Sequence, residues 1–421
     1  MNLWKLTAIA SLVISGSAFA QYTGPAVTDG GNSELTTTAG LANNAVAAHS
    51  SELPGFGPNA GNNSEHVAIY QGGSSGSGHG GHGGHGGWDD KGGSGYGSGN
   101  NLANVEQDGA KGSSTLIYQE GGNNSLSTLQ TAKSSLLYIR QSGGKNNTIG
   151  TGLLDSKGGS SGNTFTQSGS DNQMVINQDQ SDNHIYSPGQ SGTHNKAVIY
   201  QKGKNDLTAN LSGNFNEAYI SQNGQGNGAT VNQSGSFNDL TLKQKGNYNT
   251  ADLTQTGGGF YDGKNDRKGG SGHSSGGNVL DVTQLGFKNE ATVNQNGSSN
   301  TITLEQNSSN GIATIDQSGG TSRNTVTATT NVNNGLVDVD QTSGTKDSDV
   351  VINQSGGSNW DKSFDDDKYG GGYGTLVAAA KVLQTSANGS SVNINQTVAG
   401  ISTTAYVKQT GSGNTAIVNQ H

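Results

Sequence analysis

Residues 216–255 read NEAYISQNGQG, NGATVNQSGSF, NDLTLKQKGNY and NTADLTQ, and this stretch sets the pattern for most of the chain. It contains four units with an 11-residue period, each with an asparagine first and a glutamine at the sixth place after it. Apolar residues occupy the second and fourth places after each asparagine, as Leu240 and Leu242 do in the third unit. The four pairs are Asn216 and Gln222, Asn227 and Gln233, Asn238 and Gln244, and Asn249 and Gln255.

This spacing predicts a strand followed by a turn in every unit. Alternate residues of a strand point to the same face, so Asn, two apolar residues and Gln share one face, and the residues between them face water. The connecting segments are rich in Gly, Asn and Ser, which suit tight turns with positive φ. So short a strand cannot fold alone, and we therefore expect units to stack, two per rung. Equivalent Asn and Gln amides would then hydrogen-bond from rung to rung.

The same unit recurs on both sides of this stretch, with local departures. It weakens between residues 146 and 160 and recovers at Ser161, and the unit at Asn205 has Leu211 in place of glutamine. The other expected members of the amide ladders are Asn278, Gln284, Asn289, Gln295, Asn300 and Gln306. The repeat therefore predicts an all-β fold, a β-solenoid or cross-β stack of strand-turn-strand repeats with 11-residue units.

The composition fits a thin repeat core better than ordinary globular domains. Of 421 residues, 70 are glycine and only 29% are apolar or aromatic. The chain has no cysteine, which excludes disulfides, cysteine-zinc sites and thiol catalysis. Its net charge of −9 disfavours nucleic acid as a partner.

The chain divides into three regions. Residues 1–20 resemble a secretory signal peptide, with Lys5, an apolar run from Leu6 to Ile14, and predicted cleavage between Ala20 and Gln21. The apolar run is too short to span a bilayer as a helix. Residues 21–64 are expected to form a flexible, Gly/Asn-rich leader. Residues 65–421 form the repeat region, with loop inserts at about 72–100, 256–277 and 355–377.

The repeats resemble those of curlin, the subunit of curli fibres. The stretch QNGQGNGATVNQ from Gln222 to Gln233 fits the second half of the curlin pattern S-x5-Q-x-G-x-x-N-x-A-x3-Q. The stretch from Gln284 to Gln295 fits it too, with Asn289 and Ala291 in place. The resemblance covers most of residues 65–421, although this chain has more units than a typical curlin and carries long inserts.

This resemblance implies a secreted subunit of an extracellular functional amyloid. Such a subunit passes through the periplasm and a dedicated outer-membrane pore, and assembles into a curli-type pilus on the cell surface. It serves the biofilm matrix, adhesion and cell aggregation. The implied partners are other copies of the chain, a nucleator or major curlin, and the secretion pore with its accessory proteins. The strict last unit at Asn414, which has no capping helix, favours head-to-tail polymerisation.

Other side-chain groups give weaker signals. His79, His82 and His85 in HGGHGGH are weak candidates for Zn²⁺ or Cu²⁺, but a solvated spacer explains them better. An acidic insert is more simply a solvated loop than a Ca²⁺ site; its aspartates are Asp361, Asp365, Asp366 and Asp367. We expect no cofactor. Aspartates on strands are candidate gatekeepers against premature assembly, namely Asp281, Asp338, Asp340 and Asp349.

Two other classes of protein were weighed against the fibre subunit. A monomeric β-solenoid adhesin or ice-binding protein should have distinct end caps, and an ice binder also needs a flat array of threonines; neither appears in the sequence. An enzyme on a β-helix should gather Asp, Arg and Lys in one cleft, yet arginine is scarce. No catalytic arrangement stands out from the repeats, so we expect a protein that is not an enzyme.

Overall fold

The fold is built from stacked β-strands, in a computed structural model that describes most of the repeat region. The described residues are 33–35, 43–44, 66–73, 101–107, 113–122, 124–150, 164–257, 277–342, 344–356, 378–398 and 403–420. Within these residues every regular element is a strand, and none is a helix. The prediction of an all-β stack is confirmed.

The strands are numbered in chain order from β1 to β26. In the N-terminal half they are β1 (Ser33–Leu35), β2 (Asn43–Asn44), β3 (His66–Gly73), β4 (Asn101–Gln107), β5 (Ser114–Gly122), β6 (Ser125–Gln130), β7 (Leu136–Lys145), β8 (Thr148–Ile149), β9 (Phe165–Gln167), β10 (Gln173–Asp179), β11 (His184–Thr193), β12 (Lys196–Asn214) and β13 (Glu217–Gln233). In the C-terminal half they are β14 (Asp239–Asn247), β15 (Thr250–Gly257), β16 (Val279–Phe287), β17 (Glu290–Ser298), β18 (Thr301–Gln306), β19 (Ile312–Ser322), β20 (Thr325–Thr330), β21 (Gly335–Thr342), β22 (Asp349–Gly356), β23 (Ala378–Asn388), β24 (Ser391–Val398), β25 (Thr403–Ser412) and β26 (Thr415–Gln420).

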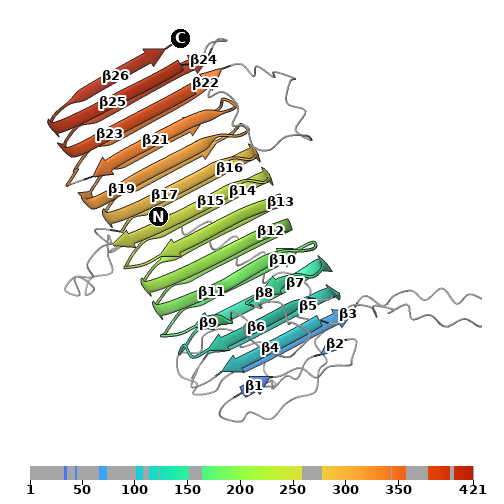
Figure 1. The fold of residues 1–421 in the computed structure, drawn as a ribbon. Helices are drawn as coiled ribbons and strands as arrows, with labels where there is room; N and C mark the ends of the chain where they lie inside the picture. Colours follow the sequence, from blue (N-terminus) through green and yellow to red (C-terminus); the bar gives the residue numbers. More distant parts are fainter. Residues whose placement is uncertain are drawn as a thin grey trace, which may run out of the picture.

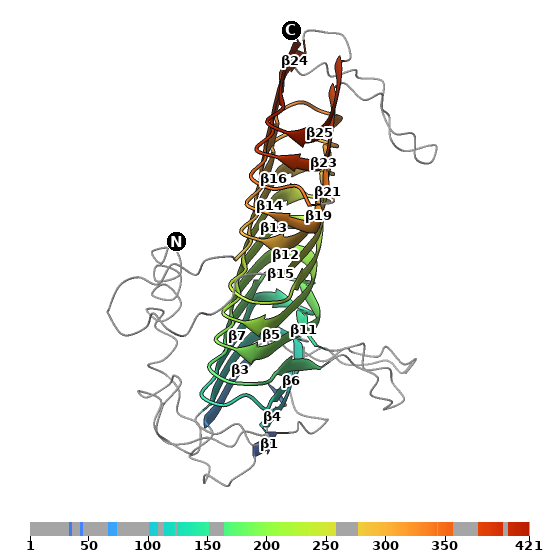
Figure 2. The same cartoon turned by 90° about the vertical axis from the view of Figure 1, so that its left-hand side faces the viewer.

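Each repeat strand pairs in parallel with the strand two units away, which builds a stack with two faces (Figures 1 and 2). β14 pairs with β16, and β15 pairs with β17, each in register. The first face contains β3, β5, β7, β10, β14, β16, β18, β20, β22, β24, β26 and the first halves of β12 and β13. The second face contains the other repeat strands and the second halves of β12 and β13. Two units therefore make one rung, as predicted.

The core is the narrow space between the two faces. Side chains alternate between buried and water-facing along the strands, as β14 shows. Ile220, Leu240 and Leu242 have no exposed surface. In the strict units before the last one, the asparagine and glutamine at the two ends are buried as completely as the apolar residues, at 0–1% exposure. The core is therefore an apolar strip bordered on both sides by buried amides.

One unit is built differently from our expectation. We expected the repeat to recover at Ser161, but β8 and β9 together form one unit, and both pair with β6 and β11. Asn147 and Ile149 supply its first half, Phe165 and Gln167 its second half, and all four are fully buried. Spacing along the chain misled the prediction, because the segment 150–164 separates the two halves within the strand rather than at a turn.

Several sequence predictions fall outside the described residues. They include the signal peptide with Ala20 and Gln21, and the three histidines His79, His82 and His85. Two short parts of the leader are described, because β1 pairs antiparallel and β2 parallel with β4. In the part of the chain that the structure covers, no helix is long and apolar enough to cross a membrane.

The regular turns carry two residues with positive φ. One is the glycine two places after the glutamine, such as Gly246 at +118°, and the other precedes the next asparagine, such as Tyr248 at +58°. The glycine is also required by close approach between rungs. A Cβ atom on Gly246 would lie 1.9 Å from the carbonyl oxygen of Gly286 in the next rung. Stacked glycines therefore allow the turns to follow one another at strand spacing.

We predict that Gly246→Ala lowers the free energy of unfolding by more than about 2 kcal/mol, because strained φ and a backbone clash add together. The control is Gly228→Ala, since Gly228 lies on the outer side of a strand, where an added Cβ would meet no atom within 4 Å. That change should stay within about 0.5 kcal/mol of the parent. Urea unfolding followed by circular dichroism measures both, and equal losses would contradict the turn argument.

Candidate functional site

The glutamines form long hydrogen-bonded ladders along the stack. Gln244 shows the full arrangement: its Oε1 accepts from Gln222 Nε2 at 2.9 Å, and its Nε2 donates to Gln284 Oε1 at 2.8 Å. The second Nε2 hydrogen crosses the core to the carbonyl oxygen of Gly228 on the other face, at 3.1 Å. Each buried amide therefore joins neighbouring rungs and also joins the two faces.

This geometry includes all the glutamines expected at ladder positions, and several more. The ladder bonds are 2.6–3.1 Å long. On the first face the ladder runs through Gln119, Gln141, Gln178, Gln201, Gln222, Gln244, Gln284 and Gln306. On the second face one segment links Gln130, Gln167 and Gln190, and another links Gln233, Gln255, Gln295, Gln317, Gln341, Gln384 and Gln409.

The asparagines bond mainly to the backbone, which differs from the glutamines. Asn216 Oδ1 accepts from the backbone N–H of Asn238 in the next rung, at 3.1 Å. Its Nδ2 donates to the carbonyl oxygens of Ser212, in its own turn, and Gly235, in the next. The same bond recurs in four further pairs. The backbone N–H groups of Asn249, Asn278, Asn289 and Asn300 donate to the Oδ1 atoms of Asn227, Asn238, Asn249 and Asn278, respectively. The asparagines therefore clamp turns as well as linking rungs.

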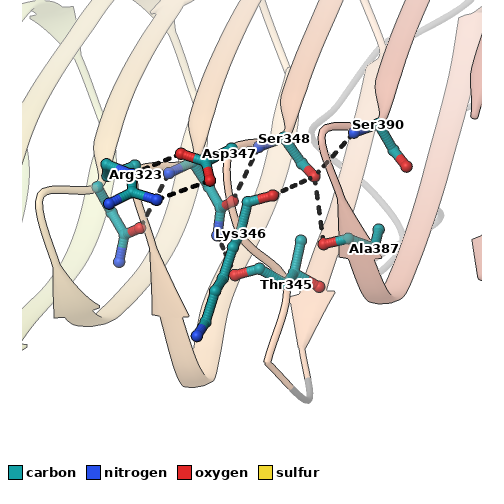
Figure 3. Close-up of polar contacts among 9 residues, drawn as sticks. Arg323, Thr345, Lys346, Asp347, Ser348, Ala387 and Ser390 are labelled. Carbon is teal, nitrogen blue, oxygen red and sulfur yellow. Dashed lines mark hydrogen bonds and ion pairs between the residues drawn. The ribbon is translucent and has the colours of Figure 1, made fainter. Parts of the chain in front are cut away.

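Ser348 and Ser390 stand at asparagine positions, and the Ser348 hydroxyl accepts the backbone hydrogen bond that an asparagine Oδ1 accepts elsewhere (Figure 3). The N–H of Ser348 donates to Asn324 Oδ1 at 3.1 Å, and Ser348 Oγ accepts from the N–H of Ser390 at 3.3 Å. Beside it, the Arg323 guanidinium donates two hydrogen bonds to the Asp347 carboxylate of the next turn. These hydrogen bonds and the positive charge lower the pKa of the Asp347 carboxyl.

The glutamine ladders are interrupted at two places with different consequences. On the first face Thr330 stands in the ladder, and its Oγ1 donates to Gln354 Oε1 at 3.2 Å. On the second face Leu211 lies between Gln190 and Gln233 and has no hydrogen to donate. Gln233 Oε1 is consequently buried without a hydrogen-bond partner. Thr330 therefore satisfies the oxygen of the next glutamine on its face, whereas Leu211 leaves the oxygen of Gln233 unsatisfied.

This difference generates a matched pair of predictions. Gln244→Leu creates a new unsatisfied oxygen at Gln284, whereas Gln233→Leu removes one at Gln233 while creating one at Gln255. Both glutamines are about equally buried and lose the same cross-core bond type. We therefore expect Gln244→Leu to cost about 1–3 kcal/mol more in unfolding free energy than Gln233→Leu. Equal costs in urea titrations would show that ladder continuity does not matter.

Three aspartates gather on the outer side of the second face. Asp340 follows Asp316 in the register of β19 and β21, and Asp338 lies two residues before it. Partial burial raises the pKa of Asp340, and the charges of Asp316 and Asp338 raise it further, while Lys381 opposes them. One carboxylate oxygen of Asp340 is buried with no partner among the described residues. An ionised Asp340 therefore disfavours the folded stack.

Because the folded-state pKa of Asp340 is raised, the folded chain gains stability as pH falls from neutral toward the ordinary aspartate range near 4. We predict that Asp340→Asn stabilises the stack at pH 7 and reduces this gain on acidification. Lys381→Gln removes the opposing cation, so the increase in stability on acidification should be larger than in the parent. Thermal midpoints between pH 7 and pH 4 test both signs, and parallel profiles for the three chains would contradict the assignment.

The two ends of the stack differ. The N–H at the first place of a unit donates toward the next rung, as Val279 does to Asn300. Successive N–H groups of a strand point to opposite neighbours, so the third and fifth places donate in the same direction as the first. In the last rung the N–H groups of Tyr406 and Ile417 therefore point out of the stack's end, and their side chains are 58% and 66% exposed. β25 and β26 pair only with β23 and β24 among the described strands. At the other end, β4 pairs with β1 and β2 on its outer edge.

The repeat also matches a known family. The family model of the curlin associated repeat matches residues 277–307, which hold β16, β17 and β18. That segment contains three complete ladder units, from Asn278 to Gln306, and the same pairing recurs through the stack on either side of it. Among curated proteins, none matches this chain. The repeat pattern, the two-faced stack and the family match together show that this chain contains curlin repeats.

Proposed function

We propose that this protein is a structural, non-enzymatic subunit of a secreted, curli-like amyloid fibre on the cell surface. The observation that carries the proposal is the open last rung, where β25 and β26 present unpaired backbone groups. An unprotected strand edge is a template for another strand, and a head-to-tail contact that does not close produces a filament. The biofilm matrix, adhesion and cell aggregation are the expected roles of such fibres.

The ladders can continue across a junction between copies. Gln420 accepts from Gln396 Nε2 at 2.8 Å and donates to the carbonyl oxygen of Thr404 at 2.9 Å, which uses one of its two Nε2 hydrogens in the described structure. Gln71 of β3 and Gln119 of β5 are register partners, so Gln71 holds the ladder position at the first rung. A second copy seated on β26 would bring its Gln71 over Gln420 and extend the ladder.

The proposal also fits the uniformity of the stack. Most rungs repeat the same buried amides, and the repeat strands keep the same parallel register, so the end surface resembles the internal contacts between rungs. Secretion by a signal peptide, passage through the periplasm and an outer-membrane pore, and a nucleating partner are parts of the same proposal. They are supported by the family match and by the sequence of residues 1–20.

Thioflavin-T kinetics on residues 21–421 after dilution from denaturant test this proposal. We expect a lag that preformed seeds shorten, and fibre diffraction at about 4.7 Å and at about 10 Å. Ile417→Pro should slow elongation strongly, because proline removes an N–H that faces the next copy and leaves the bonds to β24 intact. Ile417→Val is the matched control and should elongate like the parent.

The alternative is a monomeric β-solenoid adhesin. A soluble, β-rich monomer that stays dye-negative with and without seeds would favour this alternative and end the fibre proposal. Normal elongation by Ile417→Pro would show that fibres form without the open end of β26, and would overturn the head-to-tail arrangement while leaving fibre formation itself intact.

A further inference from the structure

The first and last described repeat strands, β3 and β26, both lie on the first face. Successive units alternate between faces, so the first face has one more strand than the second. When two copies stack in the same orientation, β26 meets β3 of the next copy on the first face. On the second face, β25 and the next copy's β4 are then separated by one vacant strand position.

Such a vacancy would leave both neighbouring strands with unpaired backbone groups inside the fibre. Parallel strands lie about 4.8 Å apart, so β25 and the next copy's β4 would be about twice that distance from each other. Neither strand can reach across to the other. Something must occupy this position if the second face is to remain hydrogen-bonded through every junction.

Two short strands of the leader, β1 and β2, lie at that position. β1 runs antiparallel to the end of β4, with Ser33 opposite Gln107 and Leu35 opposite Val105. β2 runs parallel to the beginning of β4, with Asn43 opposite Asn101. The other edge of β4 pairs with β6, so both leader strands use the edge that faces the end of the stack. Together they cover the beginning and the end of β4.

We propose that β1 and β2 complete the half-empty rung at each junction, so that β25 of one copy pairs with the leader of the next. This proposal rests on the proposed head-to-tail fibre and adds a defined role for the leader within it. All copies then have the same orientation, and the leader is an integral part of the fibre's second face.

A competing arrangement needs no filler. If each copy is turned by half a revolution about the stack axis, its β3 lies on β25 and its β4 lies on β26, in parallel and without a vacancy. The leader would then have to leave β4. The two arrangements differ in the neighbour of β26, which is β3 when the leader fills the gap and β4 when it is displaced.

Engineered disulfides distinguish the two arrangements, because the chain has no cysteine of its own. Residues 68, 104 and 417 occupy the same third place in β3, β4 and β26. Neighbouring strands bring such places within disulfide range. Fibres of the Ile417→Cys, Ala68→Cys variant should oxidise into ladders of linked copies on denaturing gels. Linkage in the Ile417→Cys, Asn104→Cys variant instead would overturn the proposal.

A parity experiment tests the filler directly. Deleting residues 33–44 should slow seeded elongation by at least about tenfold, since several hydrogen bonds per junction are lost. Duplicating residues 238–248 adds one unit, puts β26 on the opposite face and removes the vacancy, so it should restore elongation to the deleted chain. Duplicating residues 227–248 adds two units and should not.

The outcomes separate the leader's role from fibre formation. If the parent chain forms fibres and the deleted chain elongates equally fast, the leader proposal fails and the fibre proposal stands. If the two duplications behave alike, the vacancy argument is wrong. If the parent forms no fibres at all, both proposals fail together. Circular dichroism of the deleted chain, with the β-rich spectrum of the parent, shows that its stack still folds.

Discussion

The structure depends on the need to satisfy buried amides. A glutamine such as Gln244 has almost no contact with water, and leaving its donors and acceptors unpaired would cost several kcal/mol. Its partners are the same amides one rung above and one rung below, together with a carbonyl oxygen on the facing strand. Only an in-register stack supplies all of these partners at once. The amides therefore fix register, spacing and the distance between the two faces.

The turns are constrained by the same spacing. Asn216 holds its own turn through Ser212 and the next turn through Gly235, so each turn is shaped by its neighbour. Glycine is needed at the closest approach, because the carbonyl oxygen of the next turn occupies the place of a side chain. Length is far less constrained. The second face continues through the interruption between Ile149 and Phe165, since loop closure costs rise slowly with length.

Charged residues on the outer surface oppose the stacking that the buried amides favour. Ionised carboxylates on the outer side oppose stacking without altering the core. Asp316 and Asp340 lie in register on neighbouring strands, where like charges repel. The break at Leu211 also destabilises the stack, here from inside the core, because it leaves Gln233 with an unsatisfied oxygen. The stack is thus built from strong repeats with local weaknesses.

The sequence by itself determined the strand, the turn, the 11-residue period and the buried amide positions, because these follow from local spacing and side-chain chemistry. It also indicated two units per rung and the curlin family. Only the tertiary structure decided that Asn147 and Gln167 belong to one unit and that β3 and β26 share a face. It also decided that Thr330 satisfies the next glutamine on its face while Leu211 leaves Gln233 unsatisfied. These features depend on which strands become neighbours, and pairing between distant segments leaves no mark in the spacing of either one.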